Sequence, residues 1–362
     1  MAKKRIDWKL FVIVSILIIW GLITLSTTSF PLSLENYNTP WHYLFHQIIM
    51  LGIGLFLALV FFFLPIEKIK KITPFLFLFN LFLMLLVFLP KIGLTIKGAS
   101  RWVNFGFFSF QPAELLKITF ILYLAAWLNG RLKQKKGFNE LFLPFLIVLA
   151  ALVLVLIMQP DMTTLAIIFI VGVMMYFFAP TPLWHTVSAA FSALALFSFF
   201  ILSQSYRLER LTSFLNPSSD PLGKGYQAKQ AAISLGSGKM FGLGLGMSRQ
   251  KFGFLPESTT DSIFAIIGEE AGFLGCFLLL LLFLAFCYFG LIIAAKNKDS
   301  FKGFLALGIT VWISLQALLN IAGIAGVLPL GGIPLPFFSY GGSHIISEIM
   351  AVGLLLNISK KT

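Results

Sequence analysis

The chain has 362 residues, of which 58% are hydrophobic and only 11% are charged, and its mean hydropathy is +0.93. Soluble domains carry about 25% charged residues, so this composition excludes a soluble fold and indicates a polytopic membrane protein. The net charge of +13 does not indicate a nucleic-acid-binding protein, because most basic residues flank apolar segments and would face anionic lipid head groups.

Apolar segments long enough to cross a bilayer recur along the whole chain. A hydrocarbon core about 30 Å thick needs roughly 20 residues of helix. We therefore expect an all-α membrane protein in which residues 1–362 form a single transmembrane domain. About ten segments meet the length requirement, at residues 9–27, 43–65, 73–90, 113–129, 141–158, 162–180, 183–203, 263–295, 302–327 and 341–359.

The distribution of lysine and arginine predicts the orientation of these helices. If ten helices alternate, the main basic clusters all fall on one side, and basic loops mark the cytoplasmic face. Both termini are then cytoplasmic, and residues 204–260 form a large extracytoplasmic loop between the seventh and eighth helices. The clusters lie at the N-terminus and at residues 68–71, 131–136, 296–302 and 360–361.

Polar and turn-forming residues gather in three segments on the opposite side, at 91–112, 204–260 and 327–343. The cytoplasmic loops are short and contain no nucleotide-binding motif, so we expect the chemistry on the outer face. Glycines 242, 244 and 246 resemble a phosphate loop, but no strand precedes them. A turn over the membrane surface is the better interpretation.

Asp261 ends the polar run of the large loop and precedes a long apolar helix. Ionisable groups are costly at membrane depth and persist where a pathway or reaction needs them. The apolar stretch after Glu270 already has 25 residues, so Asp261 must lie at the outer boundary or in a wet cavity. Helix capping is the alternative. A cap needs one acid, whereas Glu257, Asp261, Glu269 and Glu270 lie close together in the sequence.

Other polar residues admit a structural and a functional interpretation. Glu114 and Lys117 stand three residues apart on one helix face, which predicts an ion pair that either holds the bundle or borders the site. Asp161 is placed to cap the helix that follows it. His42 and His46 have the spacing of two metal ligands, but Trp41 and Tyr43 beside them favour anchoring at the membrane interface.

Several of these segments resemble the FtsW/RodA/SpoVE (SEDS) family of bacterial wall-synthesis proteins, and the likeness runs along essentially the whole chain. The large loop carries Arg-Leu-Thr-Ser-Phe-Leu-Asn-Pro at 210–217 and Leu-Pro-Glu-Ser-Thr-Thr-Asp at 255–261. The last loop carries Gly-Ile-Pro-Leu-Pro-Phe-Phe-Ser-Tyr-Gly-Gly-Ser at 332–343. Further matching motifs lie at 98–102, 110–112, 159–161, 220–227, 242–251, 268–272 and 354–359.

The resemblance implies a ten-helix, inverting peptidoglycan glycosyltransferase in the bacterial cytoplasmic membrane. Such an enzyme polymerises lipid II on the outer face and works with a class B penicillin-binding transpeptidase and other divisome membrane proteins. Asp261 becomes the essential carboxylate and, on our hypothesis, the general base for the N-acetylglucosamine 4-hydroxyl, helped by a raised pKa. The supporting or substrate-binding candidates are Arg101, Glu114, Lys117, Arg207, Arg210, Lys251, Glu257, Ser339, Gly341 and Gly342.

Basic residues among these candidates would stabilise the leaving diphosphate. A divalent cation could share that task, although no ligand cluster in the sequence requires a metal, and no other cofactor is expected. A lipid II flippase is the main alternative, but it should carry charges threaded across the bilayer, whereas these acids cluster at the outer edge. A non-catalytic division scaffold is a third interpretation.

The motifs at 210–214 and 248–251 are more similar to the division and sporulation branch of the family than to the elongation branch. We expect a division role, and a sporulation role stays open. The division interpretation predicts that the protein is located at the division septum. The chain also departs from the family pattern at several positions. They are Ala113, Met162, Thr163, Ser262, His344 and Glu348, and the last of these needs an intramembrane partner.

Overall fold

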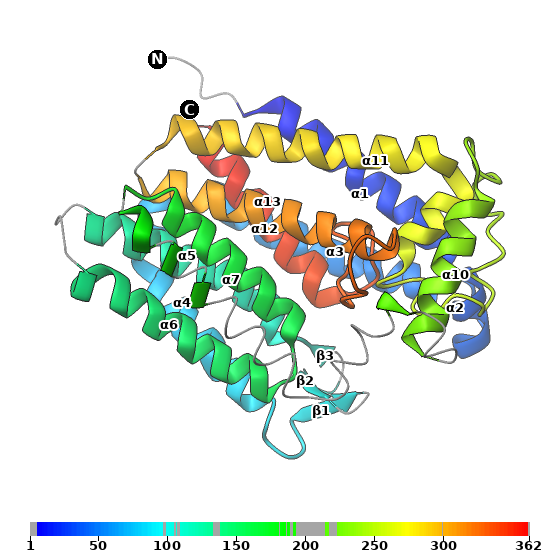
Figure 1. Cartoon of the computed structure of the whole chain (residues 1–362), viewed down its shortest axis with the longest axis horizontal. Helices are drawn as coiled ribbons and strands as arrows, with labels where there is room; N and C mark the ends of the chain where they lie inside the picture. Colours follow the sequence, from blue (N-terminus) through cyan, green and yellow to red (C-terminus); the bar gives the residue numbers. More distant parts are fainter. Residues whose placement is uncertain are drawn as a thin grey trace.

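The computed structural model describes residues 6–96, 99–104, 106, 109–132, 138–180, 182–185, 187–188, 191–192, 214–216, 223–298 and 300–360. It is a bundle of long apolar helices (Figure 1). Both termini lie at the upper left of the view, whereas the small sheet and two short helices lie toward the lower right. The bundle therefore has a terminal end and an opposite end, and most polar loops belong to the opposite end.

The first four helices are α1 (Trp8–Thr28), α2 (Phe30–Tyr37), α3 (His42–Phe63) and α4 (Ile66–Leu86). The Asp7 side chain caps α1 by accepting from the backbone N–H groups of Lys9 and Leu10 at 3.0 and 3.1 Å. Helix α4 begins earlier than the predicted residue 73, because it includes the charged turn at 67–71 and accommodates Pro74 inside the helix.

A three-stranded antiparallel sheet follows α4, so the expectation of an all-α protein is wrong in this segment. Its strands are β1 (Gly93–Ile96), β2 (Ala99–Asn104) and β3 (Ser109–Phe110), in the order β1-β2-β3. Val103 pairs with Gly93 on one side and with Phe110 on the other. Strands of two to six residues give almost no alternating pattern, which is why the sequence did not reveal them.

The remaining helices include the most buried helices of the bundle and the short helix α10 of the large loop. In α5, α12 and α13 most residues are buried, whereas α3 and α4 expose most of their apolar side chains. An apolar helix with exposed sides fits contact with lipid. The bounds are α5 (Pro112–Leu132), α6 (Phe138–Met158), α7 (Met162–Phe177), α10 (Lys224–Ser237), α11 (Ile263–Lys296), α12 (Phe301–Ile324) and α13 (Gly342–Ser359).

Seven of the described helices, α1, α3, α4, α5, α11, α12 and α13, are long and apolar enough to cross a membrane. Helices α6 and α7 correspond to the predicted spans at 141–158 and 162–180, but their qualifying apolar stretches are shorter, at 142–158 and 162–177. The predicted span at 183–203 lies mostly outside the described residues. The structure therefore supports a multi-pass membrane protein.

The two ends of the chain meet at the terminal end of the bundle. The backbone N–H of Asp7 donates to the Ser359 hydroxyl at 3.3 Å, which places the start of α1 beside the end of α13 (Figure 1). Helix α13 packs along α3, and Gly353 allows this close approach because a Cβ there would lie 2.6 Å from the Ala58 carbonyl oxygen. Both termini lie on the same side, as the charge distribution predicts.

Candidate functional site

Asp261 lines a cavity of about 340 Å³ at the end of the bundle opposite the termini. The lining comes from segments far apart in the sequence: strand β2, the first turns of α5 and α7, the turn before α11, and the loop that leads into α13. Most of the lining side chains are polar. They include the charged residues Arg101, Glu114, Lys117, Asp161 and Asp261, together with the aromatic residues Trp102 and Tyr340.

The backbone of Asp261 and the two residues before it is held by three hydrogen bonds. The N–H of Tyr340 donates to the carbonyl of residue 259 at 2.8 Å, and the Ser339 hydroxyl donates to that of residue 260 at 2.6 Å. The Asn320 amide donates to the carbonyl of Asp261 at 2.8 Å. Three consecutive carbonyls are thus fixed from α12 and the 333–341 loop, which presets the position of the carboxylate.

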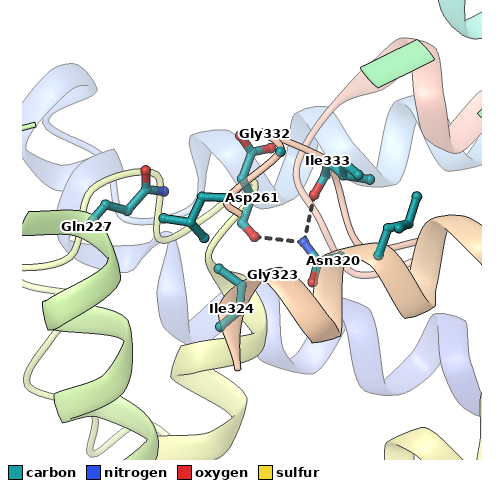
Figure 2. Close-up of a pocket in the computed structure, with 10 residues that line it drawn as sticks. Gln227, Asp261, Asn320, Gly323, Ile324, Gly332 and Ile333 are labelled. Carbon is teal, nitrogen blue, oxygen red and sulfur yellow. Dashed lines mark hydrogen bonds between the residues drawn. The ribbon is translucent and has the colours of Figure 1, made fainter. Parts of the chain in front are cut away.

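The carboxylate of Asp261 lies beside Gly332 (Figure 2). A Cβ on Gly332 would come within 3.3 Å of Asp261 Oδ2, so this glycine leaves room for the carboxylate. Asn320 also donates to the Ile333 carbonyl at 2.6 Å, which ties the 333–341 loop to the same amide. The helix cap interpretation of Asp261 is wrong, because α11 begins at Ile263 and its N-cap residue is Ser262.

Glu114 and Lys117 form the predicted ion pair, with 2.8 Å between Lys117 Nζ and Glu114 Oε2, and both side chains are buried. The pair also borders the cavity, so the structural and the functional interpretations both describe its position. Lys117 Nζ donates to Gln316 Oε1 at 3.0 Å, which joins α5 to α12. The buried Lys117 side chain thus has a carboxylate and an amide as hydrogen-bond partners, as buried polar groups require.

Gln316 extends this network to Glu348, whose partner was unknown from the sequence. The Gln316 amide donates to Glu348 Oε1 at 3.2 Å, and the backbone N–H of Phe337 donates to Glu348 Oε2 at 2.9 Å. Glu348 therefore holds the 333–341 loop from within α13. Because this loop carries Ser339, the network reaches the turn that presents Asp261.

Arg101 and Asp161 both line the cavity, near the turn between α6 and α7. Arg101 Nε donates to the Gln159 carbonyl at 3.0 Å, and its Nη2 donates to the Pro160 carbonyl. These bonds fasten the sheet to the turn. Asp161 accepts from the backbone N–H of Thr164 at 3.1 Å, which confirms the predicted N-cap of α7.

The loop that enters α13 contributes Ser339, Tyr340, Gly341 and Gly342. Gly341 lines the cavity, whereas Gly342 lies against α3, because a Cβ there would come 3.0 Å from Met50. The Tyr340 hydroxyl lies 3.0 Å from Nδ1 of His46. Burial raises the pKa of Tyr340 to about 12, so its phenol stays protonated at physiological pH.

Four other charged residues, two in the large loop and two in α11, hold the large loop in place. Lys251 Nζ lies 3.1 Å from Glu270 Oε1 and donates to the Gly246 carbonyl. Glu269 accepts from the backbone N–H of Arg249 at 3.0 Å, and Glu257 accepts from the Thr260 hydroxyl at 2.8 Å. None of Lys251, Glu257, Glu269 and Glu270 is among the described residues that line the cavity with Asp261.

The three glycines of the large loop wrap around a kink in α11. Gly242, Gly244 and Gly246 have φ of 82, 105 and 78°, a region that favours glycine, and α11 is kinked at Gly272. The N–H groups of residues 243 and 244 donate to the carbonyls of residues 269 and 270 at 2.9 and 3.0 Å. Gly242 permits the close contact, because a Cβ there would lie 2.1 Å from the Glu270 carbonyl oxygen.

Two predicted site residues, Arg207 and Arg210, lie outside the described residues. Within the part of the chain that the structure describes, no group of three His, Cys, Asp or Glu side chains could hold a metal ion. His46 binds Tyr340, and the ring of His42 stacks on that of Tyr37 at 3.6 Å between centroids. Both histidines therefore contact aromatic side chains of this chain, and their anchoring at the membrane interface stays a prediction.

Sequence reasoning missed Gln316 and Asn320, the two amides of α12 that organise the site. They stand four residues apart on one face of an otherwise apolar helix, and both are buried. Such a pair was a usable signal, since buried amides in a membrane helix need hydrogen-bond partners. Their partners lie in other helices and loops, so the sequence alone could not identify them.

Three carboxylates of the described residues line the cavity. Glu114 pairs with Lys117, and Asp161 caps α7. Asp261 lies on a turn whose backbone is fixed, and Arg101 and Lys117 supply positive charge to the same cavity. This arrangement suits a proton transfer near a negatively charged group.

The chain is similar to known proteins along its whole length. Residues 7–362 match the family model described as cell cycle protein, FtsW/RodA/SpoVE. A relative from Aliivibrio salmonicida, named probable peptidoglycan glycosyltransferase FtsW, is 36% identical over 98% of this chain and 89% of its own length. Stage V sporulation protein E of Bacillus subtilis is 37% identical over 99% of this chain and 98% of its own length.

Solved structures show the same fold. A chain from a study of the structural coordination of polymerization and crosslinking by a peptidoglycan synthase complex has a TM-score of 0.78 and 26% identity, with 99% of this chain and 98% of that chain covered. The rod shape determining protein RodA of Thermus thermophilus has a TM-score of 0.71 and 25% identity, with 99% and 97% covered.

Proposed function

The chain belongs to the FtsW/RodA/SpoVE family of cell cycle proteins and is a peptidoglycan glycosyltransferase, and we propose that it polymerises lipid II with Asp261 as its catalytic base. The observation that carries the proposal is the position of Asp261. It lies on a turn with a fixed backbone, in a polar cavity of about 340 Å³ that Arg101 and Lys117 also line. Cavities of this size can hold a substrate group.

The proposed reaction joins two lipid-linked saccharides. Asp261 accepts the proton of the N-acetylglucosamine 4-hydroxyl as that oxygen attacks the anomeric carbon of the other saccharide. The bond from the anomeric carbon to the lipid diphosphate breaks with inversion, and the diphosphate leaves with its electron pair. General base catalysis of this kind contributes about 10²- to 10⁴-fold to a rate.

The cations of the cavity would stabilise the charge that develops on the leaving diphosphate. Arg101 and Lys117 already have partners that hold them in place, so little reorganisation is needed when negative charge appears. We propose the same stabilising role for Arg207 and Arg210. Lys251 acts indirectly, because its ion pair with Glu270 holds the large loop against α11.

The membrane arrangement of the proposal follows from the charge distribution and the fold. We propose one domain of ten spans with both termini in the cytoplasm, since both termini lie at the same end of the bundle. The cavity then opens toward the outer face of the bacterial cytoplasmic membrane. One structural relative belongs to a peptidoglycan synthase complex that coordinates polymerization and crosslinking, which supports a class B penicillin-binding transpeptidase as partner.

Division at the septum, with other divisome membrane proteins, is the cellular role that we propose. The motif at 248–251 and the FtsW-named relatives support it. Sporulation is the second candidate, because the Bacillus subtilis sporulation protein is 37% identical over nearly the whole chain. Depletion of the protein during vegetative growth separates the two, since a division enzyme is needed then and a sporulation enzyme is not.

The test of the proposed chemistry uses purified wild-type and Asp261→Asn proteins with lipid II and the partner transpeptidase. We expect glycan strands from the wild type and none from the variant, with both proteins binding the partner. Both proteins are reconstituted in liposomes, and lipid II translocation is measured in the same preparations. Translocation that depends on Asp261, without polymer from the wild type, would identify a flippase instead.

A further inference from the structure

We propose that His344 contacts the substrate and that its Nε2 accepts a hydrogen bond from the saccharide; this inference rests on the proposed function. His344 lies in the first turn of α13 and lines the same cavity as Asp261.

The imidazole is buried, and one of its nitrogens has no protein partner. The side chain of His344 is 5% exposed, and its Nε2 makes no hydrogen bond. Buried polar atoms in native proteins nearly always have a partner, and leaving one unsatisfied costs about 1–3 kcal/mol. A ligand in the cavity would supply the missing partner.

The other nitrogen faces the protein. A Cβ built on Gly341 would come 2.5 Å from Nδ1, which places this nitrogen against the turn before α13. We assign the ring proton to Nδ1, on the side of the Ser339 backbone. In the neutral ring Nε2 is then an acceptor, and its partner must be a donor.

This requirement identifies the part of the substrate that His344 meets. An ionised diphosphate offers only acceptors, and a hydrocarbon chain offers neither donor nor acceptor. The hydroxyl groups and the acetamido N–H of an aminosugar are donors. Thr163 and Thr164 line the same cavity, and their hydroxyls donate to the Gly331 carbonyl and to Asp161, which leaves lone pairs that can accept from a saccharide. His344 therefore marks the saccharide side of the cavity.

Two substitutions of His344 distinguish the roles of its two ring nitrogens. Asparagine places its amide near the position of Nδ1 and removes the group at Nε2, whereas glutamine can reach the position of Nε2. We expect His344→Asn to fold with an unchanged melting temperature but to lower kcat/KM for lipid II by about 5- to 100-fold, mainly through KM. His344→Gln should stay within about threefold of the wild type.

Lipid II analogues that lack single saccharide donors then identify the contact. The analogue that lacks the donor bound by His344 should react more slowly than lipid II with the wild type. In His344→Asn the same analogue should lower the rate little further, because the two changes remove the same hydrogen bond. Equal losses in both proteins for every analogue would contradict the contact.

The outcomes also separate this inference from the proposed function. If the wild type makes no glycan, the proposed function fails. If the wild type polymerises lipid II and Asp261→Asn does not, a wild-type kcat/KM for His344→Asn overturns only the role of His344. A His344→Asn protein that does not fold as a monodisperse species would assign the ring to packing and would overturn the inference as well.

Discussion

Asn320 is predicted to control the activity by fixing the backbone of Asp261. Its amide donates to the carbonyls of Asp261 and Ile333 at 2.8 and 2.6 Å, and its side chain is buried. Asn320→Ala leaves these two carbonyls without that donor. At about 1–2 kcal/mol for each, the loss of stability is about 2–4 kcal/mol.

The chain offers a matched control for this substitution. Asn357 in α13 also donates to two backbone carbonyls, those of Phe61 and Leu64 at 2.7 and 2.8 Å, and it is equally buried. Its partners lie at the terminal end of the bundle, far from the cavity. Asn357→Ala should therefore cost a similar free energy of unfolding without moving Asp261.

The difference between the two variants is expected in the catalytic rate. A misplacement of about 1 Å can lower a rate by about 100-fold, so we expect Asn320→Ala to lose about 10- to 100-fold in kcat per folded protein. Asn357→Ala should stay within about threefold. The measurements are thermal unfolding in nanodiscs and the initial rate of lipid II polymerisation. Equal specific activities for the two variants would refute the positioning role of Asn320.

Two further predictions concern the loop that wraps α11. Lys251→Met should destabilise the protein by about 3–5 kcal/mol, because it leaves the buried Glu270 unpaired, whereas Lys229→Met on the exposed face of α10 should change little in thermal unfolding. Gly242→Ala should be more destabilising than Gly244→Ala, although both have positive φ, since a Cβ on Gly242 would overlap the Glu270 carbonyl and the nearest atom at Gly244 is 3.6 Å away. Equal melting temperatures within either pair would contradict the close contact.

The sequence predicted the apolar framework well because lipid requires long uninterrupted helices. The predicted spans at 263–295 and 302–327 correspond to α11 and α12, and the span at 341–359 to α13. The sheet at 93–110 escaped detection because its strands are short. Helix α4 was started too late because its first turn carries charges, which in a membrane protein resemble a loop.

The candidate site was predicted only in part, for reasons of geometry. Glu269 and Glu270 stand close to Asp261 in the sequence, but they lie about two helical turns further along the chain, where they contact the large loop. Lys251 pairs with Glu270 and therefore also lies away from Asp261. Gln316 and Glu348 lie 32 residues apart, on different helices, so their hydrogen bond depends on packing that no local pattern records.

Asp261 and Asp161 provide the most direct measurement of the central claim, since both are carboxylates of the same cavity. Asp161→Asn keeps an oxygen that can cap α7, whereas Asp261→Asn removes the proposed base. The measurement is the initial rate of glycan formation from lipid II by each reconstituted variant with its transpeptidase. We predict a loss of at least about 100-fold for Asp261→Asn and less than about tenfold for Asp161→Asn. Wild-type synthesis by Asp261→Asn would contradict the account.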